Sequence, residues 1–433
     1  MNILLVNVHY EQNMGLFQKY FLQSLTLRQL VAITPKKYVV DILEDIKPLK
    51  INYDGDYDII GISAVTPSAL HAYKIADEFR KRGKIVVLGG YHPSALPEEA
   101  KQHADSVVIG EAESTWPKLL DDVDNGKIEP YYRNKSPVDP KLIPNPERKR
   151  YISYYTPAVK TTRGCPIGCE FCSISHKEFG HVFRKKPIEK VVEDIESIKE
   201  KVIFFADPSL TTDVEYTKQL FRELIGLNKK FTYFQGNVNI LAKDDELLKL
   251  ASEAGCIYWH VGFESVSQKT LDFMGKTTNK VEEYVAAIKK INNYGMAVFG
   301  EFVFGFDTDA PDIFEKTGRI IEDWNIIPGF QVLTPYPGSP LFNRLDREGR
   351  ILTRDWAKYT TRDVVFQPKH MTPQHLEEGV NRLVRNFYSY NKAIKRTTKA
   401  IKIGFHPFLF SLSTNLGKAI HIKLRPDIFS QIR

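Results

Sequence analysis

The cysteines constrain this chain most, because three of the four lie in one short segment, T-T-R-G-C-P-I-G-C-E-F-C-S at residues 161–173. Cys165, Cys169 and Cys172 follow a C-x3-C-x2-C spacing, which lets one loop wrap a single cluster. An iron–sulfur cluster is normally held by four Cys thiolates, so three would leave one iron open to another ligand. The alternative, a structural zinc site, usually pairs C-x2-C with a second half-site, and the sequence shows none. The segment therefore predicts an iron–sulfur cluster with a free coordination position.

Phe171 stands directly before the third cysteine. This spacing, with an aromatic residue at that position, resembles the signature of radical SAM enzymes. The resemblance implies a [4Fe-4S] cluster with Cys165, Cys169 and Cys172 as metal ligands, and S-adenosylmethionine (SAM) bound to the open iron. It also implies that Phe171 packs beside the cofactor. An external donor such as flavodoxin or ferredoxin would supply the electron that cleaves SAM to a 5′-deoxyadenosyl radical.

The composition limits the class of protein. A chain of 433 residues with 42% hydrophobic and 26% charged residues is typical of a soluble globular protein of two or three domains. No apolar run approaches the ~18 residues of a membrane span, and the first residues are typical of a β-strand, not of a signal peptide. The clustered cysteines favour a reducing compartment in which thiols act as ligands. We therefore expect a cytoplasmic protein.

The first part of the chain alternates short apolar runs with a helical pattern. A helix is predicted at residues 68–82, where Leu70, Tyr73, Ala76 and Phe79 recur on one face. This alternation predicts a Rossmann-like, doubly wound parallel sheet that binds ligands beyond the carboxyl ends of its strands. The predicted strands are residues 3–8, 58–63, 84–89 and 106–110.

The segments after these strands, I-S-A-V-T, L-G-G-Y-H-P and I-G-E-A-E, resemble the cobalamin-binding domain that precedes the barrel in one radical SAM subfamily. Cobalamin-binding domains that donate an axial histidine carry D-x-H-x-x-G, and the radical SAM subfamily commonly lacks this ligand. This chain has N-V-H-Y-E-Q around His9. The difference leaves open whether His9 ligates cobalt, and whether the domain keeps the fold without the cofactor. The resemblance implies that the cofactor is contacted by Ser63, Thr66, Gly89, Gly90, Tyr91 and His92.

A second β/α series begins near residue 156. Six predicted strands (residues 157–162, 202–207, 231–236, 257–262, 297–305 and 329–334) alternate with helical patterns, which predicts a partial TIM-type (β/α)6 barrel with its chemistry at the carboxyl ends of the strands. The predicted domains are residues 1–140, a Pro-rich linker at 141–155, the barrel at 156–345 and a helical C-terminal subdomain at 346–433.

Polar residues follow several barrel strands, where the resemblance to radical SAM proteins gives them roles. It implies that Asp207 and Ser209 hold the methionine moiety of SAM, and that Glu264 and Ser265 lie near its ribose. The alternative interpretation of each of these four residues is an ordinary capping residue at a strand-to-helix junction. Two further residues are candidates for catalysis, Glu301 and Tyr336.

The C-terminal residues 391–433 hold nine Lys or Arg against a single acid, Asp427, beside the apolar run G-F-H-P-F-L-F-S-L. This composition fits peripheral association with an anionic membrane, and equally a solvated helix pair with a small packed core. The tail carries no recognised nucleic-acid motif, so no nucleic-acid partner is expected.

The overall likeness is to members of the subfamily that modify lipids and other apolar molecules. It implies cobalamin-assisted C-methylation, or C–C bond or ring formation, on an apolar and preferentially lipid substrate. A cobalamin-independent radical SAM enzyme whose first domain binds substrate stays open. A tRNA methylthiotransferase is disfavoured because the first 164 residues contain no cysteine. A non-catalytic cofactor-binding protein is disfavoured because the cysteine motif is complete.

Overall fold

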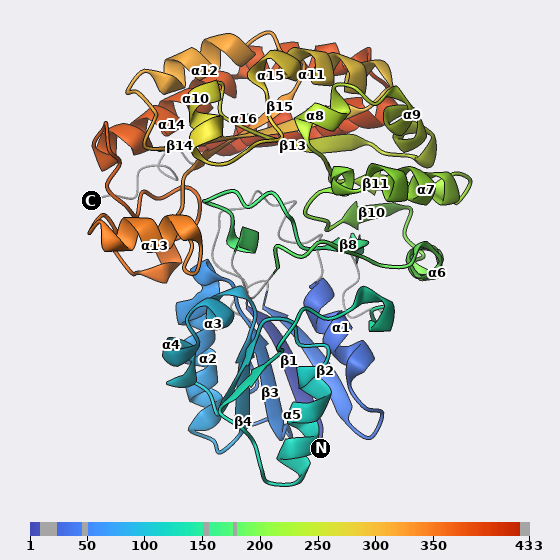
Figure 1. Cartoon of the computed structure of the whole chain (residues 1–433), viewed down its shortest axis with the longest axis vertical. Helices are drawn as coiled ribbons and strands as arrows, with labels where there is room; N and C mark the ends of the chain where they lie inside the picture. The colour runs from blue at the N-terminus through green and yellow to red at the C-terminus, as the bar shows by residue number, and fades with distance from the viewer. Residues whose placement is uncertain (9–23, 46–50, 150–155, 176–179, 425–433) are drawn as a thin grey trace.

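The computed structural model describes residues 1–8, 24–45, 51–149, 156–175 and 180–424. An N-terminal sheet domain lies at one end, and a curved sheet covered by helices lies at the other (Figure 1). The segment that carries the cysteines runs between the two. His9, whose part as a cobalt ligand the sequence leaves open, lies outside the described residues.

The N-terminal domain is a six-stranded sheet in the order β2-β1-β3-β4-β5-β6, with parallel pairing throughout. The doubly wound prediction is confirmed, and the order places a topological switch point between β1 and β3. The edge strands β2 and β6 were not predicted from the sequence. The strands are β1 (Asn2–Val8), β2 (Val39–Asp45), β3 (Ile59–Ser63), β4 (Ile85–Gly89), β5 (Ser106–Ile109) and β6 (Tyr131–Arg133).

Both faces of this sheet are buried. Along β1, Ile3 and Leu5 pack against α1 (Leu25–Ile33) and α5 (Thr115–Asp124), while Leu4 and Val6 pack on the side of α2 (Ala69–Arg80). Side chains alternate across a strand, so a near-continuous apolar run is what a sheet with two covered faces requires. The short helices α3 (Tyr91–Ala95) and α4 (Pro97–Lys101) follow β4 on the α2 side.

The barrel strands form an open arc of parallel strands. The sheets β7-β10-β11 and β12-β13-β14-β15 are joined by a parallel bridge between Phe231 and Cys256, and the chain turns through Tyr233 at a φ of 64°. The arc confirms the predicted partial barrel. Its strands are β7 (Ala158–Val159), β10 (Val202–Phe205), β11 (Lys230–Thr232), β12 (Phe234–Gln235), β13 (Tyr258–Glu264), β14 (Ala297–Phe304) and β15 (Ile327–Val332).

Helices cover the outer face of this arc (Figure 1). Trp259, Phe263 and Phe302 point outward into the large core that these helices share with the sheet. Cys256, the one cysteine outside the 161–173 segment, also belongs to this core, at 7% exposure. The helices of this region are α6 (Ile188–Ser197), α7 (Val214–Leu224), α8 (Val238–Leu241), α9 (Asp245–Ala254), α10 (Gln268–Phe273), α11 (Tyr284–Asn293), α12 (Ile313–Ile321) and α13 (Pro340–Arg347).

The C-terminal part is helical, as predicted, but one predicted helix is divided. The pattern from Pro373 to Ile394 predicts one helix, whereas the chain turns at Ser389 between α14 (Pro373–Phe387) and α15 (Tyr390–Ile401). Helix α14 packs on α12 and β15, and α15 forms an antiparallel pair with α16 (Phe405–Leu424). None of the helices in the described parts of the chain combines the length and apolarity that crossing a bilayer requires.

Candidate active site at the cysteine loop and the domain interface

The cysteine loop is closed by a short antiparallel pair of strands that was not predicted from the sequence. Strand β8 (Thr162–Arg163) pairs with β9 (Arg184–Lys185), and Cys165 N–H donates to Gly180 O at 3.3 Å. Gly164 has a φ of 78°, and a Cβ there would collide with Val182 O. The tight base of the loop therefore requires the glycine that precedes the first cysteine.

All four cysteines lie in described residues, and no disulfide joins any two of them. Burial raises the pKa of the Cys169 thiol to about 12, against the opposite effect of Lys276, and burial also raises the pKa of Cys172. The thiols therefore lose protons when they bind metal. Within the described residues no three His, Cys, Asp or Glu side chains converge on one metal ion. Three soft thiolates in one loop still fit a [4Fe-4S] cluster, because each binds a different iron.

Asp207 stabilises the segment that leads into this loop. Its buried carboxylate accepts hydrogen bonds from the backbone N–H and the hydroxyl of both Thr161 and Thr162, at 2.5 to 3.3 Å. Burial raises its pKa, and these donors act in the opposite direction. The resemblance implies that Asp207 holds the methionine moiety of SAM. In the structure, however, its carboxylate oxygens accept hydrogen bonds from the two threonines. Asp207 is a positioning residue for the strand that leads to Cys165.

Two ion-paired arginines connect the loop to the N-terminal domain. Arg163 pairs with Glu111 at 3.1 Å and also with Glu113, and Arg184 pairs with Glu111 at 2.8 Å. Both glutamates follow β5, and the side chains of the four residues are only 10–18% exposed. Such buried pairs are costly to break, so they fix the cysteine loop against the strand ends of the first domain.

A second ion-paired group holds the loop from the barrel side. Glu170, between two of the cysteines, pairs with Arg344 at 2.6 Å, and Arg344 pairs with Asp307 at 2.7 Å. Two backbone bonds support this contact: Glu170 N–H donates to Met274 O at 3.1 Å, and Leu341 N–H donates to Glu170 O at 3.0 Å. Phe171 also turns to this side, with its ring 5.8 Å from that of Phe306.

The end of β13 brings a charged pair to the cysteines. Glu264, at a φ of 63°, folds back and pairs with Lys276 at 3.2 Å. Burial opposes the charge of Lys276, but Glu264 and the cysteines outweigh it and raise its pKa. No sequence pattern marked Lys276, because its partners are distant along the chain. Ser265 accepts a hydrogen bond from Ser267 N–H at 3.1 Å, as a local capping residue does.

Ser209 belongs to a buried polar group at the ends of β10 and β12. Its hydroxyl lies 3.1 Å from Thr211 Oγ1 and accepts from Asn237 Nδ2 at 3.0 Å. The parts in SAM binding that the resemblance implies for Ser209, Glu264 and Ser265 stay predictions. The structure places all three at carboxyl ends of barrel strands, where the chemistry of such barrels is found.

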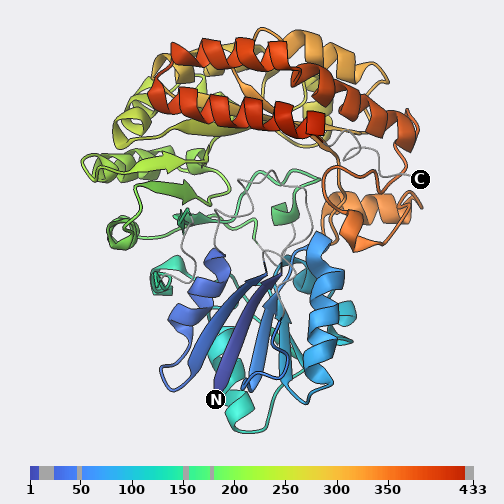
Figure 2. The same ribbon diagram turned by 180° about the vertical axis from the view of Figure 1, so that it is seen from behind.

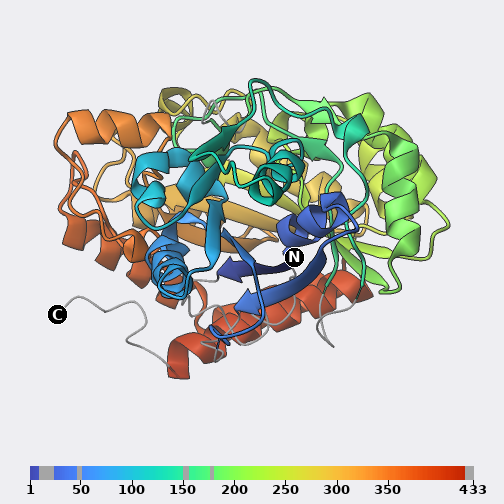
Figure 3. The ribbon, with the colours of Figure 1, turned by 90° about the horizontal axis from the view of Figure 1, so that it is seen from below.

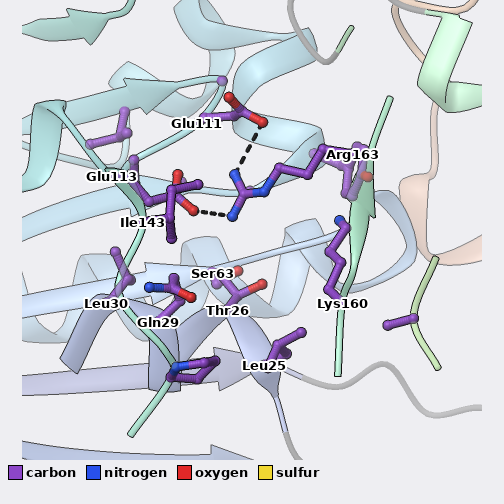
Figure 4. Close-up of a pocket in the computed structure, with 18 of the residues that line it drawn as sticks. Leu25, Thr26, Gln29, Leu30, Ser63, Glu111, Glu113, Ile143, Lys160 and Arg163 are labelled. Atoms are coloured by element: carbon purple, nitrogen blue, oxygen red, sulfur yellow. Dashed lines mark hydrogen bonds and ion pairs between the residues drawn. The ribbon is translucent and has the colours of Figure 1, made fainter. Parts of the chain in front are cut away.

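A cavity of about 410 Å³ lies beyond the carboxyl ends of β1, β3, β4 and β5 (Figure 4). Of the predicted cofactor residues, Ser63, Gly89, Gly90 and Tyr91 line it. Helix α1 supplies Leu25, Thr26, Gln29 and Leu30, and the barrel side supplies Lys160 and Arg163. Mixed apolar and hydrogen-bonding walls at a switch point fit the nucleotide tail of cobalamin better than the larger corrin ring.

The structure does not bring Thr66 or His92 to this cavity. His92 is fully buried on the opposite side of the short helix α3, with Nε2 3.1 Å from Glu99 Oε1 and its ring against Trp356. Thr66 is buried in a 3-10 turn before α2. The contacts of these two side chains with the cofactor stay predictions, since neither side chain lines this cavity. The chain turns helical after each strand, so successive residues leave the strand end in different directions.

Lys160 enters the cavity from the first barrel strand, beside Arg163 (Figure 4). Burial lowers its pKa, while Asp207 and the two glutamates favour its charge. Its ammonium has no hydrogen-bond or ion-pair partner among the residues that the structure describes. An amine that lines a cavity without such a partner is a group that a ligand can satisfy.

The inner face of the barrel carries a continuous stack of aromatic rings. Phe204 lies 4.5 Å from Tyr233, Tyr233 lies 4.3 Å from His260, and His260 lies 5.4 Å from Phe299, with ring planes within 28°. Below the stack, Phe410 of α16 lies 4.0 Å from the ring of Tyr258. The four stacked residues lie on neighbouring strands or, for Tyr233, between β11 and β12, so together they form a continuous wall of rings.

Glu301 stands beside this stack. Its Oε1 lies 3.5 Å from His260 Nε2, while Glu301 Oε2 and His260 Nδ1 are buried without partners among the described residues. A Cβ at Gly329 would collide with the Glu301 carboxylate, so that glycine leaves room for it. Tyr336 instead packs against the apolar core that the first domain shares with the C-terminal segments. The catalytic roles of Glu301 and Tyr336 stay predictions.

Comparison with known proteins agrees with this arrangement. Residues 159–317 match the model of the Radical SAM superfamily, and residues 39–120 match that of the B12 binding domain. Bacteriochlorophyllide d C-12(1)-methyltransferase of Chlorobaculum tepidum is 32% identical over 86% of this chain and 84% of its own length. The chain belongs to the cobalamin-binding radical SAM family. Its cofactors are a [4Fe-4S] cluster, SAM and cobalamin.

Two further comparisons support the family assignment. Bacteriochlorophyllide d C-8(2)-methyltransferase of Chlorobaculum tepidum is also 32% identical, over 86% of this chain and 87% of that protein. The cobalamin-dependent radical SAM enzyme OxsB, in its structure with aqua-cobalamin and SAM, shares the fold with a TM-score of 0.71 at 15% identity, over 98% of this chain and 75% of OxsB. The protein is thus a cobalamin-dependent radical SAM enzyme.

Replacing Asp207 tests its positioning role. We expect Asp207→Ala to lower the free energy of unfolding by about 2 kcal/mol, because it leaves buried donors of Thr161 and Thr162 without an acceptor. We also expect less iron per chain after anaerobic cluster reconstitution. Denaturant unfolding and iron analysis measure the two effects. Asp244→Ala, which removes an N-cap of α9, is the control: it should cost about 1 kcal/mol and leave the iron content unchanged. Full iron content in Asp207→Ala would contradict the assignment.

Replacing Arg163 tests the connection between the domains. Arg163→Met leaves Glu113 and Glu111 with fewer buried partners, so the free energy of unfolding should fall by about 3 kcal/mol. The exposed pair of Arg382 and Glu315 gives the matched control, because Arg382→Met should cost less than about 1 kcal/mol. Urea unfolding compares the two variants, and equal losses would show that the domain contact does not depend on Arg163.

Proposed function

We propose that the protein is a methyltransferase that adds a methyl group to a carbon of a flat, apolar substrate bound in the barrel. The observation that carries this proposal is the stacked wall of Phe204, Tyr233, His260 and Phe299. Aromatic rings prefer offset-stacked contacts, so such a wall favours a planar or ring-bearing apolar molecule. The two bacteriochlorophyllide methyltransferases at 32% identity, which by name act on a tetrapyrrole, support the same substrate class.

The buried polar atoms next to the wall would fix the substrate in orientation. Binding sites for apolar ligands are lined by apolar groups with a few placed polar groups that provide specificity. Glu301 Oε2 and His260 Nδ1 are such groups, since neither has a partner in the described part of the chain. We therefore expect the substrate to carry a polar substituent that contacts this pair.

When bound, the cofactors would supply the chemistry, namely abstraction of a hydrogen atom from a substrate carbon by the radical from SAM, and delivery of a methyl group from SAM by way of cobalamin. The chain supplies the geometry. Glu170, Arg163 and Asp207 hold the cysteine loop, and Lys276 places a positive charge beside it. An external one-electron protein such as flavodoxin or ferredoxin would be the donor.

The deciding experiment is anaerobic purification with cluster reconstitution and added hydroxocobalamin. We expect about four irons and one cobalt per chain. SAM with a deuterated methyl group should then transfer the label to a component of a tetrapyrrole or lipid extract, detected by mass spectrometry. Iron without cobalt would overturn methyl transfer from cobalamin. An unlabelled product with a new ring and no added methyl group would point to cyclisation instead.

Variants of the polar pair test substrate binding. His260→Phe keeps a ring in the stack but loses both nitrogens, and Glu301→Gln keeps the shape but loses the charge. Each should raise the KM for the substrate about ten- to a hundredfold, the effect of losing a hydrogen bond to a charged group. The slow cleavage of SAM without substrate should stay at the wild-type rate. An unchanged KM in both variants would remove the pair from the binding site.

Replacing Lys160 tests the cofactor cavity. We expect the Lys160 ammonium to donate to an amide or phosphate oxygen of cobalamin, so Lys160→Met should weaken hydroxocobalamin binding about tenfold. A spectroscopic titration without SAM measures this, independently of activity. Lys127→Met, in the exposed turn after α5, makes the same charge change away from the cavity and should bind normally. Equal affinity of the two variants would show that the cavity does not receive the cofactor at Lys160.

A further inference from the structure

Helix α16 is apolar on more than one side. Phe408, Phe410, Leu412 and Ile422 are interspersed with Phe405, Leu409, Leu416 and Ile420 around its circumference. A helix that is hydrophobic all round is normally buried on all sides. Here only one side is covered by the barrel: Phe410 stacks on Tyr258, and Lys418 lies over the ring of Phe299 at 5.1 Å.

Helix α15 covers a second side of α16, and the pair lies side by side at the surface (Figure 2). Arg396 of α15 contacts Asn415 of α16 at 3.3 Å in the buried seam. Seen from below the first domain, α16 runs along one edge of the molecule (Figure 3). The outward face of this hairpin therefore has no covering element among the described residues.

That outward face, here called the hairpin face, concentrates exposed apolar side chains. Ile401 and Phe405 flank the turn between the helices and are 59% and 69% exposed. Ile394, one heptad before Ile401, is 51% exposed, and Leu409, one turn after Phe405, is 41% exposed. An exposed apolar patch of contiguous residues marks an interaction site, whereas single exposed apolar residues do not.

The Asp, Glu, Lys and Arg content of the two hairpin helices is entirely basic. Residues 390–424 contain seven Lys or Arg and no Asp or Glu. Lys392 and Lys399 pair with Glu322 and Asp323, which directly follow α12. Lys395 and Lys402 are exposed and form no ion pair with an acid in the described residues. Both lie beside Ile394 and Ile401. A second copy of this chain would bring lysines against lysines, so the charge disfavours self-association.

We propose that the hairpin face docks on the surface of an anionic lipid bilayer. Amphipathic helices bind there when apolar side chains enter the headgroup region and basic side chains meet anionic lipid. The proposal rests on the proposed function in one respect: an apolar substrate would be found in that bilayer. The inner side of α16 contacts the barrel wall, so docking would bring the substrate-binding domain to the membrane.

Vesicle flotation with the full chain tests this. We expect the protein to float with vesicles of phosphatidylcholine and phosphatidylglycerol but not with phosphatidylcholine alone, and less at high salt. Phe405→Ser/Leu409→Ser should reduce the bound fraction at least about fivefold, because it removes the inserted apolar side chains. Lys395→Glu/Lys402→Glu should reduce affinity by at least about fivefold per charge.

The matched control replaces exposed apolar residues elsewhere. Leu352→Ser/Val39→Ser, at 52% and 64% exposure, should float like the wild type. Loss of flotation only in the hairpin variants, with unchanged cobalt, iron and SAM cleavage, separates docking from catalysis. Absence of flotation in the wild type overturns docking whatever the activity. So does a wild-type dimer by light scattering that Phe405→Ser/Leu409→Ser dissociates, because a second copy would then occupy the face.

Discussion

The position of the cysteine loop depends on buried ion pairs with both the first domain and the barrel. Arg163 and Arg184 attach its base to Glu111 and Glu113 of the first domain, and Glu170 attaches its middle to Arg344 of the barrel side. Removing one partner of such a pair leaves an uncompensated charge in a low-dielectric region. The loop can therefore hold one position only while both domains are in place. The arrangement of the two domains thus determines where the cluster lies.

Strand alternation divides the barrel sheet into two chemically different faces. On β13, Trp259, Val261 and Phe263 enter the core beneath the helices, whereas His260 and Glu264 face inward. Because side chains alternate along a strand, the outer residues can be selected for packing and the inner ones for binding. This is why the inner face can carry buried polar atoms without disrupting the core that stabilises the sheet.

The sequence predicted the features that depend on local pattern. The cysteine spacing, the apolar strands β1, β3, β4 and β5, and the barrel series all have short-range signals. The edge strand β2 was missed because acids interrupt its apolar run. The helix break at Ser389 was missed because no Pro or Gly marks it. Lys276 and the pairing of Arg163 with Glu111 could not be found, since their partners are brought together by tertiary folding alone.

One short segment connects the two cofactor regions. Lys160 enters the cavity of the first domain, Thr161 and Thr162 bind Asp207, Arg163 pairs with Glu111, and Cys165 follows. These residues lie on consecutive positions, so a ligand that moved Lys160 would act on the strand that leads to the first cysteine. A rigid, hydrogen-bonded segment with two sites at its ends is the kind of physical connection through which binding at one site can change the other. The cavity and the cysteine loop are therefore parts of one site, built from two domains.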